Sequence, residues 1–345
     1  MLSDGTFESL PVKSVEANYG KNMPLTAKAP KDLVPFEKVG SDCTLDEFIA
    51  QMSDDELCEF MGGSAPTGVC NTSAFSGMKR VGVPDIPTAD GPAGLRLNEE
   101  CGISTTAFPC ATLLACTWDP ELVEEVGIAG AKEVKENNLA VWLTPGLNIH
   151  RHPLCGRNFE YFSEDPLISG KMATAMVQGI QKNGIAATVK HFACNNKEIN
   201  RFQSDSRVSE RALREIYLKG FEICVKESSP ENLMTSYNKI NGVWSHYNYD
   251  LATTILREEW GYKGNIVTDW WMRKAAMPEF PKIKNNAYRV RAQVDVLMPG
   301  GESYSKQKYA FDKAQLATLD QPDGLTRAEL QRTAMNVLRF AMTRI

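Results

Sequence analysis

Short apolar runs alternate with longer amphipathic stretches along most of the chain. Apolar residues that recur every three or four positions predict five helices, at 119–137, 166–182, 209–226, 248–259 and 326–343. Compact apolar runs between them predict six strands, near 86–89, 139–143, 185–189, 232–236, 264–268 and 294–298. Strands that alternate with helices are typical of parallel βαβ units. We therefore expect an α/β fold, a (β/α)₈ TIM-like barrel in which either two strands are poorly marked or the barrel is irregular.

The first part of the chain lacks this alternation. Prolines at positions 11, 24, 30 and 35 interrupt any periodicity in residues 1–43, and polar residues dominate there. Such a segment is typical of an extended arm or linker. From Thr44 onwards apolar residues share one face of a helix, and Ser53 to Glu56 form the capping box of a second helix. The sequence thus predicts an extended arm or linker over 1–43 and a barrel domain over 44–345.

Composition and charge exclude several classes of function. The net charge of −5 offers no basic surface for nucleic acid, and no apolar run approaches the ~20 residues of a membrane span. The first residues lack the features of a signal peptide, so we expect a cytoplasmic protein. The nine cysteines are scattered and the four histidines lack His-x-x-x-His spacing. We therefore expect no disulfide framework, no metal and no cofactor.

Polar side chains follow five consecutive predicted strands at the point where each strand ends. They are Asp90 and Arg96 after the first strand, Arg157 in the loop after the second, Lys190 and His191 after the third, Tyr237 after the fourth, and Asp269 after the fifth. Because a parallel barrel gathers the carboxyl ends of its strands at one face, we expect these side chains to line one pocket.

The residue types in this pocket favour a polyhydroxylated ligand. Two carboxylates, Asp90 and Asp269, stand among cationic hydrogen-bond donors, and Trp270 and Trp271 follow Asp269 directly. A carboxylate beside an anomeric carbon can act as a nucleophile, and Lys190 and Arg157 would keep it ionised.

Each of these assignments has a structural alternative. Asp269 would then only cap the following helix, and His191 would be a core histidine bonded to a backbone carbonyl. Arg157 would only pair with Glu160 or Glu164.

Four long motifs make the chain resemble the catalytic barrel domain of the family-three glycoside hydrolases, in particular their β-glucosidase branch. The motifs are Thr88 to Arg96, Gly156 to Pro166, Val189 to Phe192 and Thr268 to Trp271. The resemblance implies a retaining, exo-acting β-glucosidase with Asp269 as nucleophile. It implies that Asp90, Arg96, Arg157, Lys190 and His191 bind sugar hydroxyls, that Tyr237 lies beside the nucleophile, and that Trp270 forms part of the subsite wall.

A retaining glycosidase also needs a general acid about 5–5.5 Å from its nucleophile. Single-domain β-N-acetylglucosaminidases of this family carry a histidine in an Asp-Ser-His stretch, where this chain has Arg207 after Asp205 and Ser206. Arginine cannot exchange a proton at a workable pH. The β-glucosidase branch takes a glutamate from a second domain, which precedes the barrel in some members. We therefore expect the acid to come from another domain, a separate chain or a dimer partner.

Three other readings remain open from the sequence. The barrel could be a β-xylosidase or another exo-glycosidase, it could bind sugar without catalysis, or phosphate could replace water as the acceptor.

Overall fold

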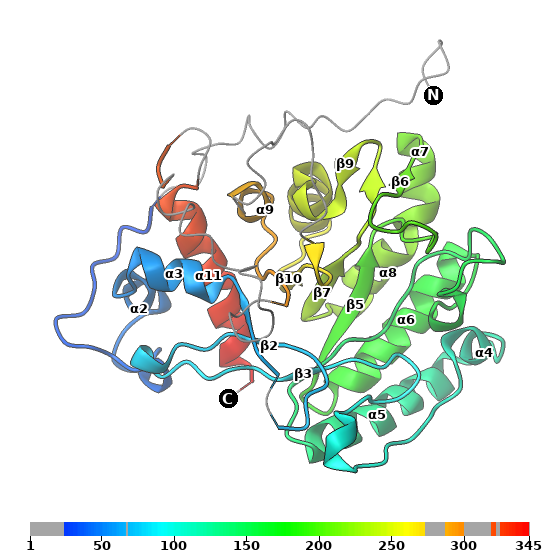
Figure 1. Cartoon of the computed structure of the whole chain (residues 1–345), viewed down its shortest axis with the longest axis horizontal. Coiled ribbons are helices and arrows are strands. Elements are labelled where there is room, and N and C mark those ends of the chain that lie inside the picture. The colour runs from blue at the N-terminus through cyan, green and yellow to red at the C-terminus, as the bar shows by residue number, and fades with distance from the viewer. Residues whose placement is uncertain (1–23, 67, 273–286, 300–318, 322–324, 345) are drawn as a thin grey trace, which may run out of the picture.

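Five parallel strands form the central sheet of the computed structural model (Figure 1). The structure describes residues 24–344, apart from 67, 273–286, 300–318 and 322–324. The strands are β3 (Thr88–Ala89), β4 (Val141–Trp142), β5 (Ala186–Phe192), β7 (Asn232–Thr235) and β10 (Asn265–Val267). They lie side by side in chain order, and every pair is parallel. The five corresponding predicted strands are confirmed, although most are shorter than predicted.

Isolated bridges extend the sheet beyond its two edge strands, β10 and β3. Val267 pairs with Val296, and Leu297 pairs with Gly62. Gly62 leads into β1 (Gly63–Ser64), which is antiparallel to β2 (Ala74–Phe75), and Phe75 bridges back to Ile86 before β3. The described residues thus form an incompletely hydrogen-bonded ring of eight strand segments, three of whose links are isolated bridges. This is an irregular (β/α)₈ barrel.

The two segments that the sequence did not mark are β1 and β2, which have two residues each and no apolar alternation. The predicted strand at 294–298 pairs only through Val296 and Leu297. A small separate sheet contains β6 (Asp205–Ser206), β8 (Lys239–Ile240) and β9 (Val243–Trp244).

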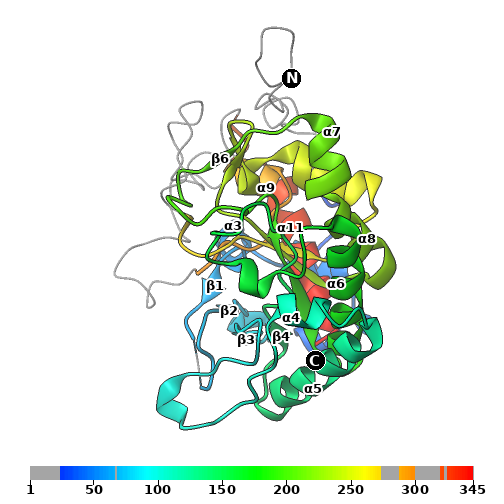
Figure 2. The same cartoon turned by 90° about the vertical axis from the view of Figure 1, so that its right-hand side faces the viewer.

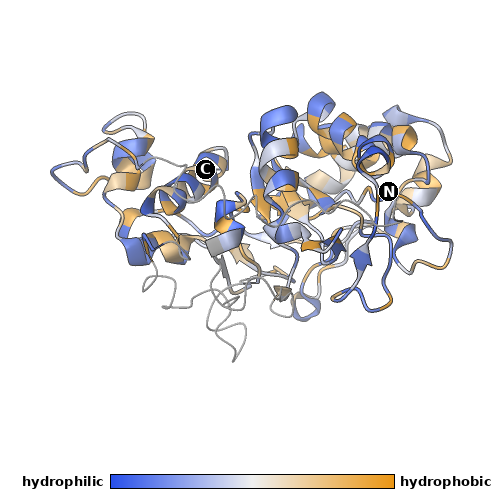
Figure 3. Cartoon of the chain, turned by 90° about the horizontal axis from the view of Figure 1, so that it is seen from above, coloured by the Kyte–Doolittle hydropathy of each residue, from blue (hydrophilic) through white to orange (hydrophobic). Residues whose placement is uncertain are grey.

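Helices cover the outside of the ring. On one side, α5 (Pro120–Glu136), α6 (Pro166–Gln181) and α8 (Lys219–Ser228) pack against one another in succession, with α4 (Ala111–Ala115) at their edge (Figure 2). On the other side, α11 (Arg327–Met342) packs against α2 (Leu45–Ala50), α3 (Asp54–Phe60) and α9 (Ala287–Arg291). Helices present hydrophilic residues outward (Figure 3).

Short 3₁₀-helical turns lie in the connecting segments. They are η1 (Phe36–Lys38), η2 (Lys79–Val81), η3 (Glu99–Cys101), η4 (Asn158–Glu160) and η6 (Ser245–Tyr247). No helix in the described ranges is long and apolar enough to cross a membrane.

Helix starts follow the sequence signals closely. Asp119 and Asp165 accept hydrogen bonds from the first amides of α5 and α6, and a proline opens each helix. Ser53 and Glu56 form the predicted capping box of α3.

Two predicted helices are wound differently from the prediction. The helix expected at 209–226 consists of α7 (Glu210–Ala212), a π-helical turn η5 (Leu213–Tyr217) and α8, and the one expected at 248–259 is the π-helix η7 (Asp250–Glu259). In η5 the amide of Leu218 donates to the carbonyl of Leu213 at 2.8 Å. Both leucines are fully buried, and the wider winding brings residues five apart toward one face.

The described part of the predicted arm lies on the barrel domain. The Phe36 ring packs against the Phe48 ring of α2, with the ring centroids 5.5 Å apart. The Leu25 amide donates to the side-chain oxygen of Gln331 in α11 at 3.2 Å. The division of the chain at residues 43 and 44 stays a prediction.

Candidate active site

A pocket of about 310 Å³ opens at the carboxyl ends of the parallel strands. Its lining consists of Asn71, Thr72, Asp90, Arg96, Leu143, Arg157, Lys190, His191, Arg201, Met234, Tyr237, Asp269, Trp270 and Trp271. The structure therefore brings together all eight site residues predicted from the sequence. They come from the ends of β3, β5, β7 and β10 and from the loop after β4.

Asp90 lies at one end of the pocket between two cations. The Lys190 ammonium donates to its Oδ1 at 2.7 Å, and the Arg96 guanidinium donates to its Oδ2 at 2.5 Å. Burial opposes ionisation, but the charges of Lys190 and Arg96 prevail and lower the pKa of Asp90 to about 2. Asp90 is thus a permanent anion that can accept hydrogen bonds from hydroxyl groups.

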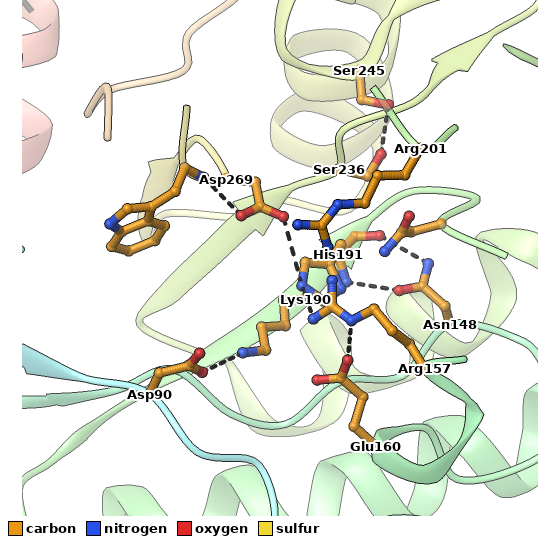
Figure 4. Close-up of polar contacts among 12 residues, drawn as sticks. Asp90, Asn148, Arg157, Glu160, Lys190, His191, Arg201, Ser236, Ser245 and Asp269 are labelled. Carbon is orange, nitrogen blue, oxygen red and sulfur yellow. Dashed lines mark hydrogen bonds and ion pairs between the residues drawn. The ribbon is translucent and has the colours of Figure 1, made fainter. Parts of the chain in front are cut away.

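Asp269 directly follows β10 and is only 6% exposed. The Trp270 amide donates to its Oδ1 at 2.7 Å (Figure 4), whereas its buried Oδ2 has no hydrogen-bond partner among the described residues. The Tyr237 hydroxyl lies near enough to help lower the pKa of the carboxyl group. Burial raises the pKa of Asp269, although the charges of Arg157 and Lys190 lower it. Arg157 and Lys190 favour the ionised form of Asp269, as expected from the sequence, but burial has the larger effect on its pKa.

His191 presents an uncharged ring to the pocket. Arg157 can only donate, so its contact of 2.9 Å with Nε2 makes that nitrogen an acceptor. The proton then sits on Nδ1, which lies 3.0 Å from the Tyr161 hydroxyl. Burial and the charges of Arg157 and Lys190 lower the pKa of His191 well below its ordinary value. Nε2 is 3.8 Å from Asp269 Oδ2, so His191 faces the nucleophile candidate instead of a backbone carbonyl.

Asn148 fixes the backbone of this histidine. Its side-chain oxygen accepts from the His191 amide at 2.8 Å, and its side-chain nitrogen donates to the His191 carbonyl at 2.9 Å (Figure 4). Arg157 also forms an ion pair with the buried Glu160, which is the pairing considered as its structural alternative. It lines the pocket as well.

Three polar lining residues were not predicted. The Arg201 guanidinium lies 4.6 Å from the centre of the Tyr237 ring and donates to Glu198 Oε2 at 3.2 Å. Asn71 accepts from the Asp90 amide at 3.2 Å, and Thr72 precedes β2. All three belong to irregular segments without a strand pattern before them.

No proton donor for a leaving group is apparent among the described lining residues, whose carboxylates are Asp90 and Asp269. A pKa of about 2 keeps Asp90 deprotonated at any working pH. Arg207 pairs with Asp205 at 2.7 Å and lines a different cavity. Within the described part of the chain, no three His, Cys, Asp or Glu residues are placed to hold a metal ion.

Comparison with known proteins assigns this arrangement to a family of enzymes. A family model described as "Glycosyl hydrolase family 3 N terminal domain" matches residues 70–340. Beta-glucosidase A of Butyrivibrio fibrisolvens is 50% identical over 299 residues, which cover 79% of this chain and 36% of that protein. A beta-glucosidase of Ruminococcus albus is 45% identical over 314 residues, covering 87% of this chain and 32% of that protein.

Solved structures show the same similarity. A beta-glucosidase from Paenibacillus barengoltzii matches with a TM-score of 0.83 and 41% identity over 99% of this chain and 38% of its own. Beta-glucosidase 3B from Thermotoga neapolitana, in complex with glucose, matches with a TM-score of 0.78 and 40% identity over 87% of this chain and 42% of its own. The chain thus spans about a third of the length of the curated relatives it matches.

Proposed function

Because the chain belongs to glycosyl hydrolase family 3, we propose that it is the catalytic barrel of a retaining, exo-acting β-glucosidase that removes terminal β-D-glucosyl residues. The observation that carries this proposal is that one small pocket holds a buried carboxylate, Asp269, together with the ion-paired cluster of Asp90, Lys190 and Arg96. A volume of about 310 Å³ is at the lower end for ligand pockets, which supports the binding of one terminal sugar.

The proposed roles follow from charge and position. Asp90, Arg96, Arg157, Lys190 and His191 bind hydroxyl groups of the sugar, since they supply fixed hydrogen-bond donors and acceptors. Tyr237 orients the Asp269 carboxylate, and Trp270 forms part of the wall. Asp269 attacks the anomeric carbon, the leaving oxygen takes a proton from a general acid, and water then releases the glycosyl-enzyme.

We propose that the general acid is a glutamate of a second domain, a separate chain or a dimer partner. Two observations support this: the described lining residues offer no carboxyl group besides Asp90 and the nucleophile candidate Asp269, and the relatives are about three times longer than the matched segment. The mechanism uses no cofactor and no metal. A cytoplasmic location is part of the proposal, supported by nine cysteines that are all free.

Covalent labelling tests the nucleophile. A 2-deoxy-2-fluoro-β-glucoside with a dinitrophenolate leaving group needs no acid, so it should attach one fluoroglucosyl group to the Asp269 peptide, detected by mass spectrometry. Asp269→Asn should not be labelled but should still bind glucose. Retained glucose binding without any label in the wild-type chain would instead indicate a sugar-binding barrel that lacks catalysis.

A second specificity has a specific observation in its favour. Two Bifidobacterium relatives named exo-alpha-(1->6)-L-arabinopyranosidase are 46% identical over 205 residues. Arabinopyranosides and xylosides lack the hydroxymethyl group of glucose, so room and hydrogen bonding beside Asp90 and Arg96 would decide between them. A panel of dinitrophenyl glycosides on the same chain, ranked by labelling or release rate, distinguishes the β-glucosidase from a β-xylosidase or another exo-glycosidase.

A further inference from the structure

A buried chain of hydrogen bonds runs from His191 away from the pocket. The Tyr161 hydroxyl lies 3.0 Å from His191 Nδ1, and the Asn195 side-chain nitrogen donates to the same hydroxyl oxygen at 3.1 Å. Tyr161, which follows η4, is fully buried, and Asn195, beyond the end of β5, is 1% exposed. Neither residue lines the active-site pocket. Any effect of the two on a bound sugar must therefore pass through the imidazole of His191.

Both contacts of the His191 ring select the same tautomer. Arg157 can only donate, so Nε2 accepts and the proton sits on Nδ1. Nδ1 in turn donates to the Tyr161 oxygen. Asn195 donates to that oxygen as well, and this second donor holds the hydroxyl group as an acceptor toward His191. The tautomer is thus fixed from the pocket side and from the interior of the protein.

This tautomer decides how His191 meets Asp269. Nε2 lies 3.8 Å from Asp269 Oδ2, which has no hydrogen-bond partner among the described residues. In the other tautomer an N–H group at Nε2 would oppose the guanidinium of Arg157, which is also a donor, and would turn to Oδ2 as the nearby acceptor. A hydrogen bond to an ionised oxygen stabilises its charge. It would therefore slow attack by that oxygen, which loses its charge as the new bond forms.

The same tautomer fixes the guanidinium of Arg157. This group binds His191 Nε2 at 2.9 Å on one side and Glu160 on the other (Figure 4). Burial raises the pKa of Asp269, and the charge of Arg157 is the strongest effect that lowers it. Without an acceptor at Nε2, one of the two contacts that hold this charge beside the nucleophile would be lost.

We propose that Tyr161 and Asn195 are positioning residues for the nucleophile. They hold His191 with its proton on Nδ1, so an electron pair of Asp269 Oδ2 stays free to bond the anomeric carbon as the bond to the leaving oxygen breaks. This inference rests on the proposed function, and it adds two residues that act on the reaction without touching the sugar.

Nuclear magnetic resonance measures the tautomer directly. Long-range ¹H–¹⁵N correlation spectra of the chain, labelled in its four histidines, distinguish a proton on Nδ1 from one on Nε2. The His191 signals are those that are missing in His191→Gln. In the wild-type chain the proton should be on Nδ1. Tyr161→Phe keeps the ring but removes the acceptor, so it should move the proton to Nε2 in a large part of the molecules.

Labelling with the dinitrophenyl 2-deoxy-2-fluoro-β-glucoside measures the effect on attack. In Tyr161→Phe the rate constant at saturating reagent should fall about tenfold, as expected for the loss of one hydrogen bond. The half-saturating concentration should change less, by about threefold at most, because the sugar contacts none of the removed atoms.

Asn195→Ala tests the outer end of the chain. It frees the Tyr161 hydroxyl to donate to Nδ1, so it should shift the tautomer and slow labelling in the same direction as Tyr161→Phe. In the Tyr161→Phe background it should have no further effect, because the two residues act through one contact. If Tyr161→Phe does not fold, Asn195→Ala decides by the same two measurements.

Tyr262→Phe is the matched control. The buried Tyr262 hydroxyl donates to the Asn265 carbonyl at 2.8 Å, at the end of β10 that is remote from Asp269. This variant also loses one buried hydrogen bond, so urea unfolding should show a similar loss of stability, but the His191 tautomer and the labelling rate should not change.

The outcomes separate this inference from the proposed function. An unchanged His191 tautomer in the variants, or slower labelling without a change of tautomer, would overturn the inference while the proposed function stands. A wild-type chain that takes no label would instead contradict the proposed function, and the inference would fail with it.

Discussion

Asp90 and Asp269 line the same pocket, yet their surroundings move their pKa values in opposite directions. Although burial opposes it, the charges of Lys190 and Arg96 lower the pKa of Asp90. At Asp269 burial prevails over Arg157 and raises the pKa. The difference separates two functions of one residue type: Asp90 is a fixed anion that accepts hydrogen bonds, whereas the poorly solvated Asp269 carboxylate is suited to attack.

Asp90→Asn should change how stability depends on pH. The folded-state pKa of about 2 is below the ordinary value of 3.8, so the ionised carboxylate stabilises the fold above pH 3.8, and this contribution is lost as pH falls toward 2. The difference in unfolding free energy between wild type and Asp90→Asn should shrink by about 1–2 kcal/mol between pH 5 and pH 2.5. Urea unfolding at each pH measures it, and a constant difference would contradict the ion-pair account.

Several of the candidate site residues predicted from the sequence lie at the end of a strand. Lys190 and Asp269 follow apolar runs directly, so their edge could be inferred from the pattern alone. Arg201 could not be predicted, because it stands in a polar loop whose path depends on its contacts with Glu198 and Tyr237. Such contacts are made by tertiary packing and leave no periodic trace in the sequence.

At the scale of elements, the helices were predicted better than the barrel. Caps such as Asp119 and Ser53 are local signals, and they start helices where expected. β1 and β2 are held by pairing with distant segments, and two residues are too few to show alternation. The π-helical winding of η5 depends on burying both Leu213 and Leu218, which only the assembled core requires.

Gly130 of α5 allows close packing that reaches the pocket. A Cβ atom at this position would collide with the indole of Trp142, whose Nε1 donates to the Gly91 carbonyl at 3.0 Å, beside Asp90. Alanine favours a helix over glycine by about 1 kcal/mol, but overpacking costs about 1–3 kcal/mol. Gly130→Ala should therefore lower the unfolding free energy and also weaken glucose binding several-fold.

Thermal unfolding and glucose titration measure both effects of Gly130→Ala. Ala129→Ser adds one atom to an exposed position of the same helix and should leave both unchanged. A Gly130→Ala protein that is more stable than wild type would contradict this prediction, because it would show that Trp142 moves aside without lowering the free energy of unfolding.

At the scale of the whole molecule, the chain should behave as a glycosidase without its acid. Glucosides whose leaving group needs protonation should react about 10²–10⁴-fold more slowly than an intact acid would allow, whereas a dinitrophenyl glucoside should still form the glycosyl-enzyme. Azide needs no general base, so it should accelerate turnover of the dinitrophenyl substrate and yield β-glucosyl azide. Product analysis by NMR measures this outcome.

Phenyl β-glucoside is the control substrate. Its poor leaving group needs an acid when the glycosyl-enzyme forms, and azide acts only after that step, so azide should not accelerate its turnover. Efficient hydrolysis of cellobiose by this chain alone, with no response to azide, would place the proton donor within the chain.

The barrel has a seam where residues 61–63 pair with Leu297, two segments that are far apart in the sequence. The Leu297 amide donates to the Met61 carbonyl at 2.8 Å, and the Gly63 amide donates to the Leu297 carbonyl at 3.2 Å. Contacts over such a long chain separation carry the largest loop-closure entropy, so they tend to form late in folding. Val296, beside the seam, accepts from the Thr268 amide at 2.9 Å. The segment that carries Asp269 is therefore expected to reach its native position only after the helices have formed, so ligand-binding competence should be among the last properties to appear as the chain refolds.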